Sequence, residues 1–222
     1  MPYIFFTASF YVSLLFLAVF GQKTWAAPLL ITDDAGIVDV NQCQIELSHN
    51  SRNNSSNIEL TPACNLFNQL EFSVPLSSED GLNSYAFQIK KPLIMHDYFA
   101  VAASVQYQPK QNETLEQWQF NVPLSLYLAE SLQLDVNMGW TQSDHHLDKM
   151  WSLAPTYNFN ELNKLSLEFY KSDSDSVTST QLVYHYQIVP EKLSIYTSYG
   201  QTLQSKPPSW VGIGLSWASA SF

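Results

Sequence analysis

The sequence carries little charge, and the charge that it does carry is mostly negative. Charged residues make up 14% of the 222 residues, and 10 Lys and Arg stand against 20 Asp and Glu, so the net charge is −10. A charged fraction this low is unusual for a soluble protein. Because nucleic-acid binding depends on Lys and Arg that meet phosphates, the composition argues against a nucleic-acid partner.

Long apolar runs are missing beyond the N-terminus. Residues 1–21 contain no charged side chain, Leu14–Phe20 form an apolar core, and Thr24 and Ala26 place small residues at the −3 and −1 positions of a signal-peptidase site. This pattern predicts a signal peptide over residues 1–26 and export from the cytoplasm. A retained membrane anchor is the alternative, since about 20 apolar residues suffice to cross a bilayer.

The sequence also holds little that would serve catalysis or metal binding. It contains no nucleophile motif, and Ser48 and His49, as neighbours in a strand, would face opposite sides. Residues 144–148 (Asp-His-His-Leu-Asp) are of metal-ligand types, but adjacent strand residues point apart. We therefore expect neither an enzyme nor a metal or cofactor site.

What the sequence does contain, from about Leu70 to Trp217, is strict alternation of apolar and polar residues. In one run the apolar positions are Leu132, Leu134, Val136, Met138 and Trp140, and the polar or small ones are Gln133, Asp135, Asn137, Gly139 and Thr141. Side chains along a strand point to opposite faces with a period of two, so each run predicts a strand with one apolar and one polar face. No helical period separates the runs, which indicates a single curved sheet.

Such runs recur at regular spacing, and their number is about twelve, an even count of the kind found in single-chain outer-membrane barrels. Turn-forming stretches such as Ser78-Glu79-Asp80-Gly81 separate them. We expect strands near residues 43–50, 57–64, 70–76, 84–91, 99–108, 116–127, 132–141, 150–158, 165–171, 179–189, 193–201 and 210–217.

The apolar faces are too bulky to point inward. A soluble barrel turns its apolar face inward, where about eight strands already fill the interior, whereas a membrane barrel turns it toward lipid. The positions expected to face outward are Phe72/Val74/Leu76, Tyr85/Phe87/Ile89, Trp118/Phe120/Val122/Leu124/Leu126, Leu165/Leu167/Phe169 and Leu182/Tyr184/Tyr186/Ile188. The opposite faces hold Glu71, Gln88, Lys90, Gln117, Gln119, Asn121, Asp135, Asn137, Glu168, His185 and Gln187.

The predicted fold is therefore all-β: a closed antiparallel transmembrane barrel of about twelve strands in a Gram-negative outer membrane, with both termini at the periplasmic end. Residues 1–26 would be the signal peptide, residues 27–42 an irregular lead-in or plug segment, and residues 43–222 the barrel. Lipid and the barrel assembly machinery are the expected partners. The terminal Phe222 resembles the signal read by that machinery, although it is out of phase with Trp217.

The two cysteines, Cys43 and Cys64, fall in the first two strands. If the first hairpin folds about Asn53-Asn54, Leu47 opposes Leu60 and Cys43 opposes Cys64, and opposed Cβ atoms lie about 4.5–5.5 Å apart, near disulfide range. In an oxidising compartment this register predicts a disulfide. Free thiols are the alternative, and a metal site is disfavoured because no further Cys or His lies nearby.

The sequence offers two groups of candidate functional residues. Thr32, Asp33 and Asp34 in the lead-in could plug or line the periplasmic mouth, or could form a capped turn with solvated acids. The second group comprises charged residues expected on the lumen face: Glu46, Glu59, Glu71, Lys90, Asp135 and Glu168. Clustered buried acids need partners, which Lys90 and Arg52 could supply. This group predicts either a cation-tolerant constriction or a structural ion-pair network.

Two motifs carry a family resemblance. Residues 28–36 (Pro-Leu-Leu-Ile-Thr-Asp-Asp-Ala-Gly), followed by Gln42-Cys43-Gln44-Ile45-Glu46-Leu47, are similar to the N-terminal signature of a bacterial outer-membrane barrel family named for the MetA pathway of phenol degradation. Residues 62–65 and 68–72 resemble its second block. Ala27 and Asn41 depart from the pattern, where Arg and Gly are usual. The resemblance implies a channel or transporter for small molecules.

We therefore expect a narrow channel or transporter for small-molecule solutes. Two alternatives remain open at this stage. One is a structural or surface-interaction barrel that conducts nothing, and the other is a soluble periplasmic barrel that binds a ligand.

Overall fold

The computed structural model describes residues 29–52, 55–67, 69–111, 115–144 and 146–219. The predicted signal peptide over residues 1–26, the hairpin tip Asn53-Asn54, His145 and the terminal Phe222 lie outside these ranges. Within them, no helix has the length and apolarity needed to cross a membrane.

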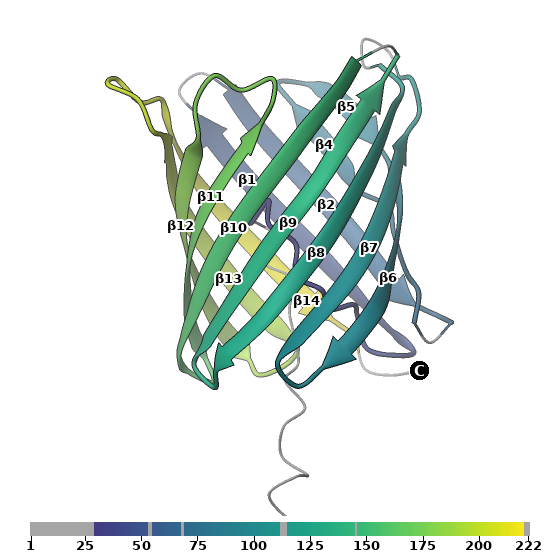
Figure 1. Cartoon of the computed structure of the whole chain (residues 1–222), viewed down its shortest axis with the longest axis vertical. Helices are drawn as coiled ribbons and strands as arrows, with labels where there is room; N and C mark the ends of the chain where they lie inside the picture. The colour runs from purple at the N-terminus through teal and green to yellow at the C-terminus, as the bar shows by residue number, and fades with distance from the viewer. Residues whose placement is uncertain (1–28, 53–54, 68, 112–114, 145, 220–222) are drawn as a thin grey trace, which may run out of the picture.

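The described residues form one antiparallel sheet that closes on itself, because β1 pairs with both β2 and β14 (Figure 1). The strands are β1 (Gln42–Arg52), β2 (Ser55–Asn65), β3 (Glu71–Ser73), β4 (Leu76–Glu79), β5 (Leu82–Tyr85), β6 (Phe87–His96), β7 (Phe99–Gln108), β8 (Gln117–Ala129), β9 (Leu132–Ser143), β10 (His146–Asn160), β11 (Asn163–Ser172), β12 (Ser179–Val189), β13 (Leu193–Thr202) and β14 (Ser209–Ala218).

Two of the barrel strands are each interrupted once, so the closed barrel has twelve strands, as predicted. Along β2, β3 is followed by β4, and β5 and β6 likewise form one line. The first break falls at Val74-Pro75, where proline has no N–H for the ladder. The pattern continues across the breaks, since Val74 N donates to Pro62 O (3.0 Å) and Ala86 N to Pro75 O (2.9 Å).

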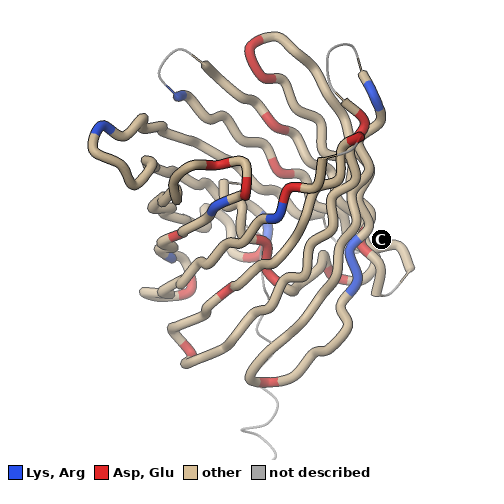
Figure 2. The backbone as a smooth tube through the Cα atoms, turned by 45° about the horizontal axis from the view of Figure 1, so that its top comes forward, with Lys and Arg blue, Asp and Glu red and all other residues tan. Residues whose placement is uncertain are grey.

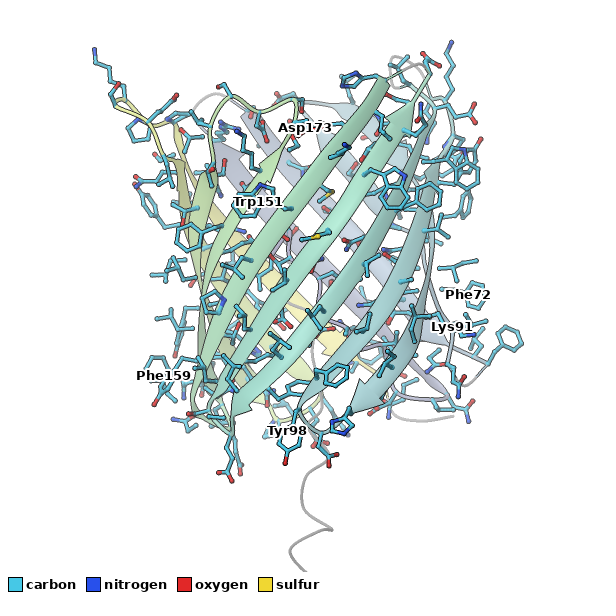
Figure 3. The ribbon with its side chains drawn as sticks, in the orientation of Figure 1. Phe72, Lys91, Tyr98, Trp151, Phe159 and Asp173 are labelled. Carbon is cyan, nitrogen blue, oxygen red and sulfur yellow. A yellow bond between two sulfur atoms is a disulfide. The ribbon has the colours of Figure 1, made fainter. Side chains whose placement is uncertain are left out.

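The outer surface of the barrel is apolar and the inner surface polar, which confirms the predicted orientation of the faces. Phe87, Ile188 and Trp217 are 52%, 48% and 45% exposed, whereas Asn137 and Glu168 are fully buried. Aromatic side chains gather near both ends of this outer surface, with Trp151 toward the upper end and Tyr98 and Phe159 toward the lower end (Figure 3). Such girdles are typical of barrels that face lipid.

The first hairpin has the predicted register. Leu47 is paired with Leu60, Ile45 with Pro62 and Cys43 with Cys64. The two cysteines form a disulfide, with their Cα atoms 4.1 Å apart. The cross-link joins the lower ends of β1 and β2, just after the lead-in ends and β1 begins.

Candidate functional site

Residues 29–41 cross the interior of the barrel before β1 begins (Figure 1, purple). At one side, Leu29 packs against Val183 on β12 and Tyr196 on β13. At the opposite side, Ala35 is fully buried against small residues of β7. The alanines at that contact leave room for a second layer of backbone inside the wall. We call residues 29–41 the crossing segment.

The first anchor of the crossing segment is Glu168 on β11. Its carboxylate accepts hydrogen bonds from both the N–H and the hydroxyl of Thr32, the latter at 2.6 Å. Gln181 on β12 donates to the same carboxylate and to the carbonyl of Leu29 (2.7 Å). Three donor groups, the N–H and hydroxyl of Thr32 and the amide of Gln181, thereby satisfy this buried carboxylate.

The second anchor is an ion pair on the inner side of the barrel wall. The ammonium of Lys90 on β6 lies 2.7 Å from Asp33 and 3.6 Å from Asp34. Lys90 is 4% exposed, so water screens this pair less than it would a surface pair. The side chain of Asn137, in the orientation that satisfies both partners, donates to the carbonyl of Asp33 (2.7 Å) and accepts from its N–H (2.9 Å).

Further contacts hold the end of the crossing segment. Ala35 N donates to Ser125 Oγ (2.9 Å), whose hydroxyl donates to Asp135 (2.6 Å). Val38 N donates to Glu71 (2.8 Å), and Asn65 donates to the carbonyl of Val38 (2.8 Å). The crossing segment is therefore tied to β2, β3, β6, β8, β9, β11 and β12 by polar groups that strand alternation places on the inner face.

Beside the crossing segment lies a cavity of about 860 Å³. Its wall comes from β1–β8, with Ala218 of β14, and the crossing segment closes one side. Two kinds of strand side chain dominate the lining: the carboxylates Glu46, Glu59, Glu71 and Glu79, and the amides Gln42, Gln44, Asn57, Gln88, Gln106, Gln108, Gln119 and Asn121. Figure 2 shows how the acidic positions (red) recur along the wall while basic positions (blue) are sparse.

The structure divides the predicted lumen residues into two sets. Glu46, Glu59, Glu71 and Lys90 line the cavity together with Thr32, Asp33 and Asp34 of the crossing segment. Asp135 and Glu168 also face inward but do not line the cavity. Glu168 accepts a hydrogen bond from Thr32 of the crossing segment, and Asp135 accepts one from Ser125. The sequence suggested Lys90 as a partner for the clustered strand acids, and its ion pairs go to Asp33 and Asp34 of the crossing segment.

Charge partners of the strand acids are correspondingly few. Glu46 accepts a hydrogen bond from Gln44 (2.5 Å), and Glu71 lies beside Lys90 in register and accepts from Val38. Arg52, the other expected partner, has its guanidinium over the ring of Trp210, 5.5 Å from the centroid. The cavity wall therefore keeps an excess of acidic side chains. Coulomb attraction across such a wall favours cations over anions.

Tyr196, Trp210 and Lys164 are inward residues that were not anticipated from the sequence, whereas His185 was expected on the inner face. His185 stacks on Tyr196 with ring centroids 4.5 Å apart, and Trp210 donates to Gln181 (3.2 Å). Lys164 lies opposite His185 in register. Strand parity alone would have identified Gln106, Gln108 and Lys164, since each falls on the polar face of its strand.

The described residues show no cluster of metal-ligating side chains. Among them, no group of three or more His, Cys, Asp or Glu side chains is arranged to hold a metal ion. Ser48 is buried on the inner face whereas His49 is exposed, so the two form no relay.

The fold is shared with outer-membrane porins and channels of solved structure. The "KdgM porin" superposes with a TM-score of 0.67 at 10% identity, over 80% of this chain and 99% of that chain. The "NanC porin" has a TM-score of 0.62 at 13% identity, over 79% and 98%. The "COG4313 outer membrane channel from Pseudomonas putida F1" has a TM-score of 0.61 at 10% identity, over 84% and 98%. At these identities the likeness establishes the fold alone.

No curated protein matches the sequence. A family model does match, over residues 14–218, and its description is "Uncharacterised conserved protein UCP029691". Because this match spans most of the chain, the protein belongs to that family.

Proposed function

We propose that this protein is an outer-membrane barrel that acts as a narrow channel for small molecules, with the crossing segment as its plug and with a preference for cationic or neutral solutes. The observation that carries the proposal is the cavity of about 860 Å³ inside a closed barrel, walled by carboxylates and amides. The apolar outer face supports insertion in lipid, where closure pairs every backbone group. The shared porin fold supports transport.

The charge of the cavity narrows the class of solute. One KdgM structure is described as a complex with "disordered oligogalacturonate", an acidic saccharide. The cavity of this protein is lined by Glu46, Glu59, Glu71 and Glu79, with Lys90 already paired to Asp33, and would repel such a ligand. Its amide row suits hydroxylated or amine-bearing small molecules, which can accept and donate hydrogen bonds.

One observation disfavours the soluble binding barrel, and another supports the non-conducting barrel. A soluble periplasmic binding barrel is disfavoured, since its apolar residues would face inward and here they face outward. A non-conducting barrel keeps one supporting observation, namely that the crossing segment is tied to strands on both sides of the lumen. We also propose that this protein is related to the barrel family named for the MetA pathway. We further propose that the barrel assembly machinery recognises Phe222.

Liposome swelling tests the proposal and separates the channel from the non-conducting barrel. Proteoliposomes of the wild type should swell in small neutral or cationic solutes and swell less in anionic solutes of equal size. A variant that lacks residues 30–40 should swell faster in all of them, because the plug is gone. If neither protein admits solute while both show the heat-modifiable gel mobility of a folded barrel, the protein is not a channel.

A further inference from the structure

The strands of the barrel separate their charges by face. Every acidic residue of the described strands points into the lumen or toward the rim: Glu46, Glu59, Glu71, Glu79, Asp135, Asp148 and Glu168. The charged side chains that point outward from these strands are lysines: Lys91, Lys149 and Lys171. Charge is costly on a surface that faces lipid tails, so outward lysines are expected only where headgroups lie.

Lys149 and Lys171 lie together near the upper end of the barrel. Lys149 is three residues from the start of β10 and Lys171 one residue from the end of β11, so at about 3.3 Å per residue both are within roughly 10 Å of the strand ends. In register, Lys149 is opposite Trp140 and Lys171 is opposite Trp151. The lysines are thus diagonal neighbours across two strands, about 7–8 Å apart at the backbone.

Tryptophans complete a compact patch around the two ammonium groups. Trp140 and Trp151 are 41% and 43% exposed on the outer face, and Trp140 stacks on Phe120 with centroids 5.1 Å apart. Tryptophan rings at this position are typical of the interface between lipid tails and headgroups. Trp151 is labelled in the upper part of Figure 3. We call Trp140, Lys149, Trp151 and Lys171 the upper Lys–Trp patch.

Three carboxylates, Asp148, Asp173 and Asp175, lie near the patch, and the N–H of Asp173 donates to the carbonyl of Lys149 (2.8 Å). Asp148 accepts hydrogen bonds from the N–H and hydroxyl of Ser174 (both 2.9 Å), and Asp175 accepts from the hydroxyl of Ser172 (2.9 Å). The ion pairs found among the described residues both belong to Lys90, inside the lumen. Among the described residues, neither Lys149 nor Lys171 forms an ion pair with any of these carboxylates.

We propose that the upper Lys–Trp patch binds the phosphate groups of an anionic lipid in the outer leaflet, with acyl chains packed on the tryptophan rings. The two lysines act as point charges that match a lipid bearing two phosphates, and the rings supply the apolar contact below them. This inference rests on the proposed placement of the barrel in an outer membrane, with the upper end outward. It does not depend on whether the lumen conducts.

The experiment uses the full-length barrel folded in detergent and bisphosphorylated lipid A as the probe, with binding followed by native mass spectrometry. Wild type should retain lipid A, and Lys149→Gln/Lys171→Gln should weaken binding by roughly tenfold or more, equivalent to about 1.4 kcal/mol. The matched control is Lys91→Gln, which removes an outward lysine in the lower half of the barrel, close to Phe72 in Figure 3 and outside the patch. It should bind lipid A as wild type does.

Three results would contradict the proposal that the upper Lys–Trp patch binds lipid phosphates. They are equal binding by the double variant and wild type, an equal loss in the Lys91→Gln control, and displacement of lipid A by millimolar inorganic phosphate, which would indicate a general anion site. Heat-modifiable gel mobility is measured in parallel for each variant. Loss of that mobility together with extraction of the protein from membranes by carbonate would contradict the outer-membrane placement itself, so the two failures are distinguishable.

Discussion

The two sides of the lumen are built from the same alternating strands but differ in what lies against them. The inner face of β1–β8 borders the cavity and presents long polar side chains, such as Glu46, Glu59 and Gln106. The inner face of β12–β14 is buried to within a few per cent, with Val183, Tyr196 and Ser216 at 1%, 1% and 0% exposure. The first side leaves space for a solute, and the second packs against the start of the crossing segment.

Side-chain size accounts for much of this difference. We call the side formed by β12–β14 the filled side and the side formed by β1–β8 the open side. On the filled side, small residues leave room for large side chains to pack against the wall. A Cβ at position 200 would come within 2.1 Å of the Trp210 ring, so Gly200 is required there. A Cβ at position 212 would meet Asn50, Ser198 and Leu29. The alternation of apolar and polar residues therefore determines which face of each strand points inward. The volume of the residues on that face determines where the lumen is open.

The largest expected effect is the loss of packing on the filled side. Tyr196→Ala removes a ring that is 1% exposed, stacks on His185 and packs on Leu29, and should lower the free energy of unfolding by about 3–5 kcal/mol. Urea titration of the barrel in lipid vesicles measures this. Gln106→Ala, on the cavity side, is the matched control and should change stability by less than about 0.5 kcal/mol. Equal losses would remove the distinction between the two sides.

The next largest effect concerns the cross-link between β1 and β2, on the open side. Cys43→Ser/Cys64→Ser removes a disulfide that spans 21 residues, and the chain-entropy model gives a destabilisation of about 3 kcal/mol. The same urea titration, run on wild type with and without reductant, should reproduce the shift. A double variant as stable as oxidised wild type would show that the open wall needs no covalent support.

A smaller effect is expected from the ion pair that joins the crossing segment to the open wall. Lys90→Met leaves Asp33 and Asp34 without their cation and should cost about 1.5–3 kcal/mol, the range for hydrogen bonds to charged groups. Hydrogen exchange at residues 31–38 should accelerate, while exchange of the strand amides should not. Lys90→Arg, which keeps the charge, should retain most of the protection. Unchanged exchange in Lys90→Met would mean that Glu168 and Asn137 hold the segment by themselves.

Much of the fold could be predicted from local pattern, because strand alternation and hairpin register depend on residues close in sequence. The facing of Lys90 and Glu168 into the lumen and the pairing of Cys43 with Cys64 are of this kind. The contact of Lys90 with Asp33 is different, since 57 positions separate the two residues and no ladder relates them. Nothing in the local pattern places an irregular segment against a particular wall.

The interruptions of the strands were missed for a related reason. Alternation continues through Pro75, so the runs near residues 70–76 and 84–91 look unbroken, although the missing N–H of the proline marks the first break. The path of residues 29–41 also determines which acidic side chains line the cavity and which contact the crossing segment. The odd or even position of a residue along its strand shows whether its side chain faces inward. Which side chains it contacts there is shown only by the packed structure.

The central claim, that the open side of the lumen is an acidic pathway, is tested most directly by the reversal potential of the purified protein in a planar bilayer under a KCl gradient. The account predicts cation selectivity for wild type and a shift of the reversal potential toward zero in Glu46→Gln/Glu71→Gln, because both carboxylates line the cavity. Asp173→Asn, in the upper loop, should leave the potential at the wild-type value. A double variant with wild-type selectivity, or a wild-type protein that prefers anions, would contradict it.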